Sequence, residues 1–296
     1  MSREEAERVE TMISARPSAP DLDARRAGFE AMAGRFEVPD GVSVQDTDFG
    51  GVPGRLVTAP GADPARVFAW LHGGAFTVGS SVSYTELCAR LSAASGLAVA
   101  CPDYRLSPEN VYPAALSDAE AAWHALGDGA VALGGDSCGG NLAVALTQRL
   151  IAGGGAPPRA LYLLSPYLDL THSGDSVRSR AELDAFVRPE TMPATAAAYL
   201  GETPADDPGA SPLFGEVAGF PPTLIHVGER EVLFDDAKRF HDKLTGAGAK
   251  SDLREWPGML HVFAFFGPWI AEGREATTAA GAFVRARCGA RDGARA

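Results

Sequence analysis

The sequence lacks the features that would direct a chain to a membrane or to nucleic acid. No apolar run approaches the roughly 18 to 20 residues that cross a bilayer, and the N-terminus, M-S-R-E-E, is charged where a signal peptide would be apolar. Lys and Arg together number 26 against 38 for Asp and Glu, which gives a net charge of −12, and no basic stripe stands out. We therefore expect a cytoplasmic protein with no nucleic-acid and no membrane partner.

Cysteine is scarce too. The four cysteines, Cys88, Cys101, Cys138 and Cys288, lie far apart, form no C-x-x-C pair and have no His cluster nearby. This spacing argues against a disulfide framework and against a zinc site, so we expect no metal. A free buried thiol acts as a small apolar side chain, and only Cys138 has a position that bears on chemistry.

The composition is that of an ordinary globular protein. Hydrophobic residues make up 46% and charged residues 22% of the 296 positions, which excludes a disordered, collagen-like or coiled-coil chain. At roughly 150 residues per domain this length suggests two domains, but large α/β enzymes often fit it into one. The order of the predicted elements has to decide between these possibilities.

Short apolar segments alternate with helical ones along most of the chain. The first forty residues are typical of two amphipathic helices, the second starting near Asp21. Strands are then predicted over 42–49, 54–58, 67–71, 97–101, 131–133, 161–164, 223–227 and 252–256, and helices over 113–126, 142–151, 234–244 and within 269–287. Apolar strands alternating with helices indicate an α/β fold, with a mostly parallel sheet covered on both faces. Residues 178–200 interrupt this alternation with a helical stretch, which we interpret as an insertion.

The segment 135–139, G-D-S-C-G, fits the G-x-S-x-G motif of a nucleophilic serine. Chance alone would produce about 0.2 such matches in a chain of this composition, so the context matters. The motif directly follows the strand predicted over 131–133 and precedes the helix predicted from Leu142, which is the strand–turn–helix setting that it requires. Glycines on both sides let strand and helix approach closely and leave the Ser137 hydroxyl exposed above the sheet.

A second glycine motif, H-G-G-A-F at 72–76, follows the strand predicted over 67–71. Successive glycines let backbone N–H groups turn toward one point, and those of Gly73, Gly74 and Cys138 would bind the oxyanion of a tetrahedral intermediate. A phosphate-binding loop would need a Lys or a helix opening on G-x-G-x-x-G, and neither is present. We expect His72 to fix this loop through hydrogen bonds.

A serine nucleophile needs a base, and the base needs a carboxylate that orients it. Of the six histidines, only His261 lies in a loop after the last predicted strand, downstream of the acid, as the order Ser…Asp/Glu…His demands. The acid should follow the strand predicted over 223–227, where four carboxylates lie between residues 229 and 236. Asp235 and Asp236 lie at the start of the next predicted helix, where acidic side chains interact favourably with the helix dipole. We therefore predict Glu231, with Asp235 as the alternative.

Together these motifs resemble the hormone-sensitive-lipase-like carboxylesterases of the α/β-hydrolase fold. The likeness covers the chain from about residue 42 onward and also rests on D-Y-R-L-S-P-E at 103–109, on Pro113-Ala114, on Gly140 and on Ser211-Pro212-Leu213. The family usually has Asp where Glu231 stands, although Glu occurs in a branch that resembles monoterpene-lactone hydrolases and antibiotic-precursor acetylhydrolases. Ala commonly occupies the position of Cys138 in the family.

The resemblance implies one catalytic domain, residues 1–296. Its fold would be a mostly parallel eight-stranded sheet with helices on both faces and a helical cap formed by 1–40 and 178–205. It also implies Ser137 as nucleophile, His261 as base, and the three oxyanion donors named above. A homodimer through the last strand and helix is a further implication.

The expected activity is hydrolysis of short-to-medium acyl esters or lactones through an acyl-enzyme, a reaction that needs no cofactor. Two alternatives stay open: an amidase or deacetylase acting on a secondary metabolite, and a non-catalytic receptor for a small molecule on the same fold. The presence of His261 argues against the receptor. The motifs do not separate ester, lactone and acetamide, because that choice lies in the shape of the pocket.

Two other sets of residues are assigned from their positions. Arg105 could form a partly buried ion pair with Glu109 or with Asp118 that braces the loop beside the serine helix. Aromatic side chains are expected to line the substrate pocket, although a core position explains them equally well. The candidate pocket residues are Phe76, Tyr84, Tyr167 and Phe214, with Phe36 and Phe186 from the cap.

Overall fold

The computed structural model of the protein describes residues 2–15 and 21–288. Within these residues one eight-stranded sheet has the order β1-β2-β4-β3-β5-β6-β7-β8. β2 pairs antiparallel with β1 and β4, and all other pairs are parallel, so the predicted mostly parallel sheet is confirmed. The strands are β1 (Ser43–Asp48), β2 (Pro53–Thr58), β3 (Asp63–Leu71), β4 (Leu97–Pro102), β5 (Ala130–Asp136), β6 (Ala160–Leu164), β7 (Thr223–Gly228) and β8 (Ser251–Trp256).

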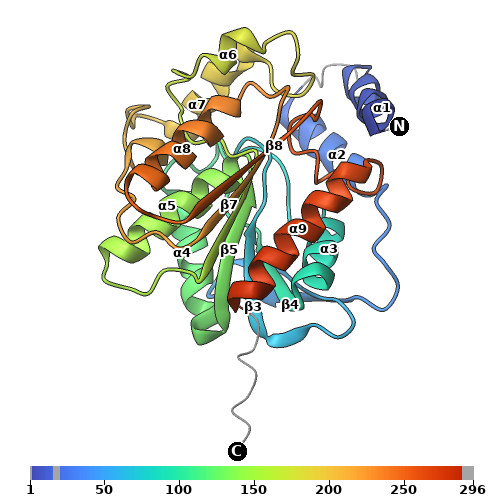
Figure 1. The fold of residues 1–296 in the computed structure, drawn as a ribbon, viewed down its shortest axis with the longest axis vertical. Coiled ribbons are helices and arrows are strands. Elements are labelled where there is room, and N and C mark those ends of the chain that lie inside the picture. Colours follow the sequence, from blue (N-terminus) through green and yellow to red (C-terminus); the bar gives the residue numbers. More distant parts are fainter. Residues whose placement is uncertain (1, 16–20, 289–296) are drawn as a thin grey trace, which may run out of the picture.

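Helices cover both faces of this sheet, as Figure 1 shows. The α-helices of the described residues are α1 (Ser2–Ser14), α2 (Leu22–Ala33), α3 (Thr85–Ser95), α4 (Ala114–Leu126), α5 (Cys138–Ala152), α6 (Ser176–Ser179), α7 (Met192–Leu200), α8 (Phe234–Gly246) and α9 (Ala271–Cys288). Side chains along a strand alternate between the two faces. Accordingly, Phe68 and Trp70 of β3 join the core with α3 and α9, whereas Ala69 and Leu71 join the core with α4, α5 and α8.

The predicted strands are all present, and the predicted helices differ from the structure mainly at their ends. β5 continues to Asp136 and α5 begins at Cys138 rather than at Leu142, so strand and helix meet at Ser137. α3 has no counterpart in the prediction. Eight of its eleven residues are buried, Thr85 and Ser92 among them, so the segment shows no alternation between a polar and an apolar face.

The described residues of the segments predicted to form the cap lie at the carboxyl end of the parallel strands (Figure 1), and residues 1 and 16–20 of the predicted cap lie outside the described residues. α2 begins as expected, because Asp21 caps it by accepting the N–H of Ala24 at 2.8 Å. Between α6 and α7, the Asp184 carboxylate accepts the N–H groups of Phe186 and Val187 and, through its other oxygen, that of Val232 at 3.0 Å. These bonds fix the inserted segment to the chain that follows β7. Among the described helices, none combines the length and apolar character that crossing a membrane would require.

Candidate active site

Ser137 lies on the tight turn between the end of β5 and the start of α5. Its backbone has φ +52° and ψ −122°, a strained conformation for a residue that carries a side chain. A Cβ at Gly135 would collide with the backbone of Gly139, and a Cβ at Gly139 would collide with the carbonyl oxygens of Leu71 and His72. The two glycines are therefore needed because the helix starts in contact with the strands, and this contact places the serine at the carboxyl end of β5.

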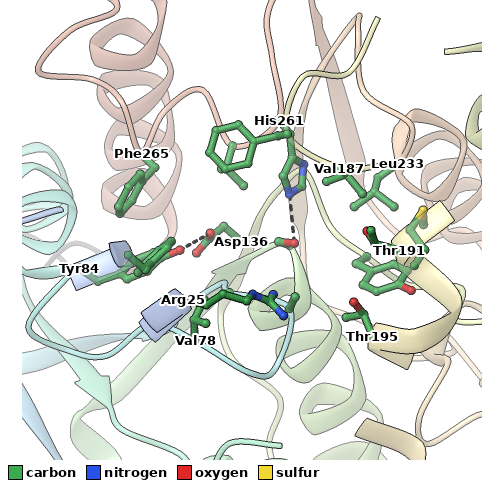
Figure 2. Close-up of a pocket in the computed structure, with 18 residues that line it drawn as sticks. Arg25, Val78, Tyr84, Asp136, Val187, Thr191, Thr195, Leu233, His261 and Phe265 are labelled. Atoms are coloured by element: carbon green, nitrogen blue, oxygen red, sulfur yellow. Dashed lines mark hydrogen bonds between the residues drawn. The ribbon is translucent and has the colours of Figure 1, made fainter. Parts of the chain in front are cut away.

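His261 reaches the serine from the loop between β8 and α9. Its Nε2 lies 3.1 Å from Ser137 Oγ, the contact drawn as a dashed line to His261 in Figure 2. Both residues are largely buried, with 4% of His261 and 9% of Ser137 exposed. Two side chains that are 124 positions apart in the chain are thus in hydrogen-bond contact, as the motif order predicts.

Glu231 holds the other ring nitrogen of His261. Its Oε2 lies 2.8 Å from His261 Nδ1, while its Oε1 accepts the hydroxyl of Ser165 at 2.7 Å and the N–H of Gly228 at 2.5 Å. These bonds replace the water that a fully buried carboxylate loses. Ser165 was not predicted. Its Oγ also accepts the N–H of Val262, so it links the acid to the histidine loop, and its position directly after β6 is the only signal in the sequence.

The two aspartates that follow Glu231 have other partners. Asp235, the alternative acid, accepts the N–H of Ser176 at 2.9 Å. Asp236 accepts the N–H groups of Leu168 and Asp169 at 2.7 and 3.0 Å. Of the competing carboxylates, Glu231 is therefore the one that contacts the histidine.

The charge of Glu231 raises the pKa of His261. Burial lowers the pKa of His261, but the hydrogen bond and the charge of Glu231 outweigh burial, so this pKa lies above its usual value of 6.5. An imidazolium formed by proton transfer from Ser137 would be stabilised by the same contact.

In the loop that follows β3, one of the three predicted oxyanion donors has other partners. The N–H of Gly73, which we expected to face the oxyanion, donates instead to Asp136 Oδ1 at 3.0 Å and to the Tyr84 hydroxyl at 3.1 Å. The N–H of Gly74 has no acceptor among the described residues, and Gly74 and Ala75 both line the cavity in front of Ser137. Positive φ angles of +123° at Gly74 and +55° at Ala75 turn the loop at this point. Two adjacent glycines in a sequence do not show which of them has a free N–H.

His72 fixes this loop, in agreement with the prediction. Its Nδ1 lies 2.8 Å from the carbonyl oxygen of Gly73, and its ring stacks on that of Tyr104 with the centroids 4.2 Å apart. The Tyr104 hydroxyl donates to the His72 carbonyl oxygen at 2.6 Å. Burial lowers the pKa of His72, which favours the neutral ring, so His72 holds the loop without carrying a charge.

Cys138 has a contact that the sequence did not indicate. Its Sγ accepts the N–H of Phe76 at 3.1 Å, and burial raises the pKa of the thiol to about 12. The thiol is therefore neutral and anchors the end of the loop after β3. The N–H of Cys138 is the first of α5 and has no partner within that helix. All four cysteines are free and buried, as predicted.

A cavity of about 230 Å³ opens in front of Ser137 and His261 (Figure 2). Three of the predicted pocket residues, Tyr84, Tyr167 and Phe186, line it. Phe29 of α2 and Phe265 of the histidine loop also line it and were not predicted as pocket residues. Their aromatic character alone does not distinguish a cavity wall from the core, since both positions favour large apolar side chains.

The other three predicted pocket residues lie elsewhere. Phe36 packs edge-on against Trp269 with the ring centroids 4.7 Å apart, and Phe76 stacks on Tyr199 at 3.6 Å. Phe214 is 39% exposed to solvent and does not line the cavity. The sequence alone does not determine where these side chains point.

The structure also decides the partner of Arg105. Its guanidinium pairs with Asp118 at 2.8 Å and not with Glu109. Glu109 is instead bound by Arg26 of α2, through Nη1 at 2.7 Å and Nη2 at 2.8 Å. Arg105 and Glu109 are both half exposed, so each pair adds little stability, and the Arg26 pair connects α2 to the loop that contains Glu109.

Comparisons with known proteins identify the family and the fold of this chain. A family model described as the α/β-hydrolase fold matches residues 68–265. An acetyl-hydrolase of Streptomyces hygroscopicus is 38% identical over 251 residues, which cover 80% of this chain and 84% of that protein. An esterase of Acinetobacter venetianus is 36% identical over 241 residues, 79% of each chain. Among solved structures, an esterase of the bacterial hormone-sensitive lipase family has a TM-score of 0.93 at 36% identity and covers 97% of this chain and 99% of its own.

Proposed function

This chain belongs to the α/β-hydrolase family and is a carboxylic ester hydrolase of the hormone-sensitive-lipase type, and on this premise we propose that Ser137, His261 and Glu231 are its catalytic triad. The proposal is carried by one observation. Hydrogen-bond contacts of 3.1 and 2.8 Å connect Ser137 Oγ, through both ring nitrogens of His261, to the Glu231 carboxylate. This arrangement makes a serine hydroxyl nucleophilic.

The reaction proceeds in two steps. Ser137 Oγ attacks the ester carbonyl while His261 Nε2 takes its proton, and the tetrahedral intermediate collapses when the same proton passes to the leaving alkoxide. Water then attacks the acyl-enzyme, again giving its proton to His261, and free acid leaves as Ser137 is restored. Glu231 stabilises the imidazolium in both steps.

The developing oxyanion needs backbone donors. We assign them to Gly74, Ala75 and Cys138, so that Ala75 takes the place first given to Gly73. Gly74 and Ala75 line the cavity, and the N–H of Cys138 is at the first position of α5, where no carbonyl of the helix can accept it. The Gly73 N–H is already bound by Asp136, so it is not available to the oxyanion.

The substrates we propose are esters or lactones with short-to-medium acyl groups. The acetyl-hydrolase named above favours the shorter end of this range, and so does a cavity of about 230 Å³. We also propose that residues 1–40 and 178–205 form a cap on a single catalytic domain, since Phe29 from the first segment and Phe186 and Met192 from the second line the cavity. A homodimer through the last strand, β8, and the last helix, α9, and a cytoplasmic location stay predictions.

The acetyl-hydrolase relative also favours one other candidate, a deacetylase that cleaves an acetamide of a secondary metabolite. It would use the same triad and differ in the bond that is cleaved. A panel of matched acetate esters and acetamides separates the two, because an esterase turns over the ester of each pair far faster. The receptor alternative is disfavoured by the intact contact between Ser137 and His261.

Labelling with a fluorophosphonate tests the assignment of Ser137. The folded protein should gain the mass of one phosphonyl group, located on the peptide that contains Ser137, and Ser137→Ala should gain none. Ser137→Ala should also lose hydrolysis of p-nitrophenyl butyrate by about 1,000-fold or more. Turnover by Ser137→Ala close to that of the wild type would sink the proposal.

A further inference from the structure

Arg25 places a positive charge in the wall of the cavity that holds Ser137. Among the described residues that line this cavity, it is the only Lys or Arg. Figure 2 shows its side chain extending from α2 into the pocket. The chain as a whole has a net charge of −12, so an exposed cation at this position is opposite in sign to the overall charge.

The position of Arg25 is set by how α2 is attached. Arg25 and Phe29 are four residues apart, so they lie on one face of the helix, and both line the cavity. Phe29 stacks on Phe265 with the ring centroids 5.8 Å apart. The next residue, Arg26, faces the domain, where it binds Glu109 and donates to the carbonyl oxygen of Thr77 at 2.9 Å. α2 is thus fixed on both sides of the residue that faces the pocket.

The guanidinium of Arg25 has no partner in the part of the chain that the structure describes. In contrast to Arg26, it donates no hydrogen bond to a carboxylate or carbonyl oxygen there. No aromatic ring of the described residues lies under it either. The acidic residues nearest the reacting atoms are engaged elsewhere. Asp136 binds the N–H of Gly73 and the hydroxyl of Tyr84, and Glu231 binds His261. The positive charge of Arg25 therefore remains available to a ligand.

We propose that Arg25 selects ester substrates that carry a carboxylate group in addition to the ester that is cleaved. A guanidinium pairs with a carboxylate through two parallel N–H donors, which orients a substrate as well as binding it. The negative charge of the whole protein disfavours anionic substrates at long range, so a local cation is what allows one to bind. This inference rests on the proposed esterase function of Ser137 and specifies its substrate class.

Matched pairs of substrates test the proposal on either side of the ester bond. Mono-p-nitrophenyl adipate carries a carboxylate on its acyl chain, and p-nitrophenyl isooctanoate replaces that carboxylate with an isopropyl group of the same shape. On the alcohol side, p-carboxyphenyl butyrate is compared with p-isopropylphenyl butyrate. The readout is the ratio of kcat/KM for the anionic member to kcat/KM for the neutral member, after subtraction of spontaneous hydrolysis.

Arg25→Gln should lower this ratio by about two- to fivefold for at least one pair, because the ion pair is partly solvated. Arg25→Lys should lower it less, since it keeps the charge and loses the fork of donors. Lys250→Gln is the matched control. Lys250 is exposed just before β8, at the end of the sheet opposite Ser137, and its removal changes the net charge equally but should leave the ratio unchanged. Added sodium chloride should reduce the difference between the wild-type and Arg25→Gln ratios, because it screens the charge of Arg25.

A ratio that is the same in wild type and Arg25→Gln for both pairs would overturn the proposal, as would an equal loss in Lys250→Gln. Hydrolysis of the neutral esters by the wild type reports the proposed function separately. If these esters are not hydrolysed at all, the assignment of Ser137 is wrong, whereas an unchanged ratio contradicts only the role of Arg25.

Discussion

The carboxylate of Asp136 accepts the backbone N–H of Gly73 at 3.0 Å. This bond joins the residue before Ser137 to the loop that carries the proposed oxyanion donors, and the Tyr84 hydroxyl reinforces it by donating to the other oxygen at 2.7 Å. Asp136 is 1% exposed. Its burial raises the pKa of the carboxyl to about 7, although the hydrogen bonds from Tyr84 and Gly73 lower it. The distance between nucleophile and oxyanion donors therefore depends on a side chain that has no part in the proposed triad.

Asp136→Ala should lower kcat by about 10- to 100-fold with a smaller change in KM, because the loop after β3 loses its tie and the oxyanion donors are displaced. Asp136→Asn keeps an oxygen that accepts the Gly73 N–H and should retain more of the activity. Steady-state kinetics on p-nitrophenyl butyrate measure both. A wild-type kcat in a folded Asp136→Ala variant would show that the bond does not position the loop.

The pH dependence of kcat/KM should report His261. Catalysis needs the neutral ring, and the pKa of His261 lies above 6.5, so activity should fall as the pH drops through a midpoint above 6.5. Glu231→Gln removes the charge that raises this pKa and should shift the midpoint to lower pH. It should also lower kcat by about 1,000- to 10,000-fold. Glu229→Gln is the control, because the only hydrogen bond of the Glu229 side chain among the described residues is the one that it accepts from the N–H of Gly258, so the midpoint should stay in place.

Stability should fall as the pH rises, in part because of Asp236. Burial, and then the nearby charge of Asp169, raise the pKa of Asp236 from 3.8 to about 8. The folded protein therefore holds a proton that the unfolded chain releases, and the resulting stability is fully present below about pH 4 and is lost as the pH rises toward 8.

Asp236→Asn should flatten this decline by up to about 1.4 kcal/mol per pH unit. Urea unfolding at a series of pH values measures the slope. Asp242→Asn, on the exposed side of the same helix α8, should keep the slope of the wild type. Equal slopes in wild type and Asp236→Asn would mean that Asp236 is already ionised in the folded state.

The thiols should be inert in the folded protein. All four cysteines are buried, and burial raises the pKa of Cys138 to about 12, so iodoacetamide should neither alkylate them nor reduce esterase activity. After unfolding in urea all four should react, which intact mass measures. Rapid loss of activity in the native state would contradict the anchoring contact between Cys138 and Phe76.

Periodicity and motif order predicted most of this architecture, because apolar strands and the order serine, acid, histidine are local or linear properties. α3 escaped prediction since both of its faces are buried. The choice between Glu231 and Asp235 depended on a contact across 30 positions, which only the folded chain makes.

The donors and the pocket walls were predicted less well. Whether the N–H of Gly73 is free depends on where Asp136 and Tyr84 point, and neighbouring glycines look alike in a sequence. Phe29 lines the cavity and Phe36 does not, although both belong to the same N-terminal segment. Such differences arise from the packing of the folded chain, and the hydrophobicity of the residues does not predict them.

Several walls of the cavity come from segments of the chain other than those that carry the reacting atoms. Arg25 and Phe29 come from α2, Phe186 comes from the segment before α7, and Met192 is the first residue of α7. Ser137, Glu231 and His261 instead follow the ends of β5, β7 and β8. Point changes in the walls can therefore alter which ester fits while the bonds among the triad stay as they are. Such a division lets the chain acquire new substrates by small evolutionary steps, each of which preserves a working enzyme.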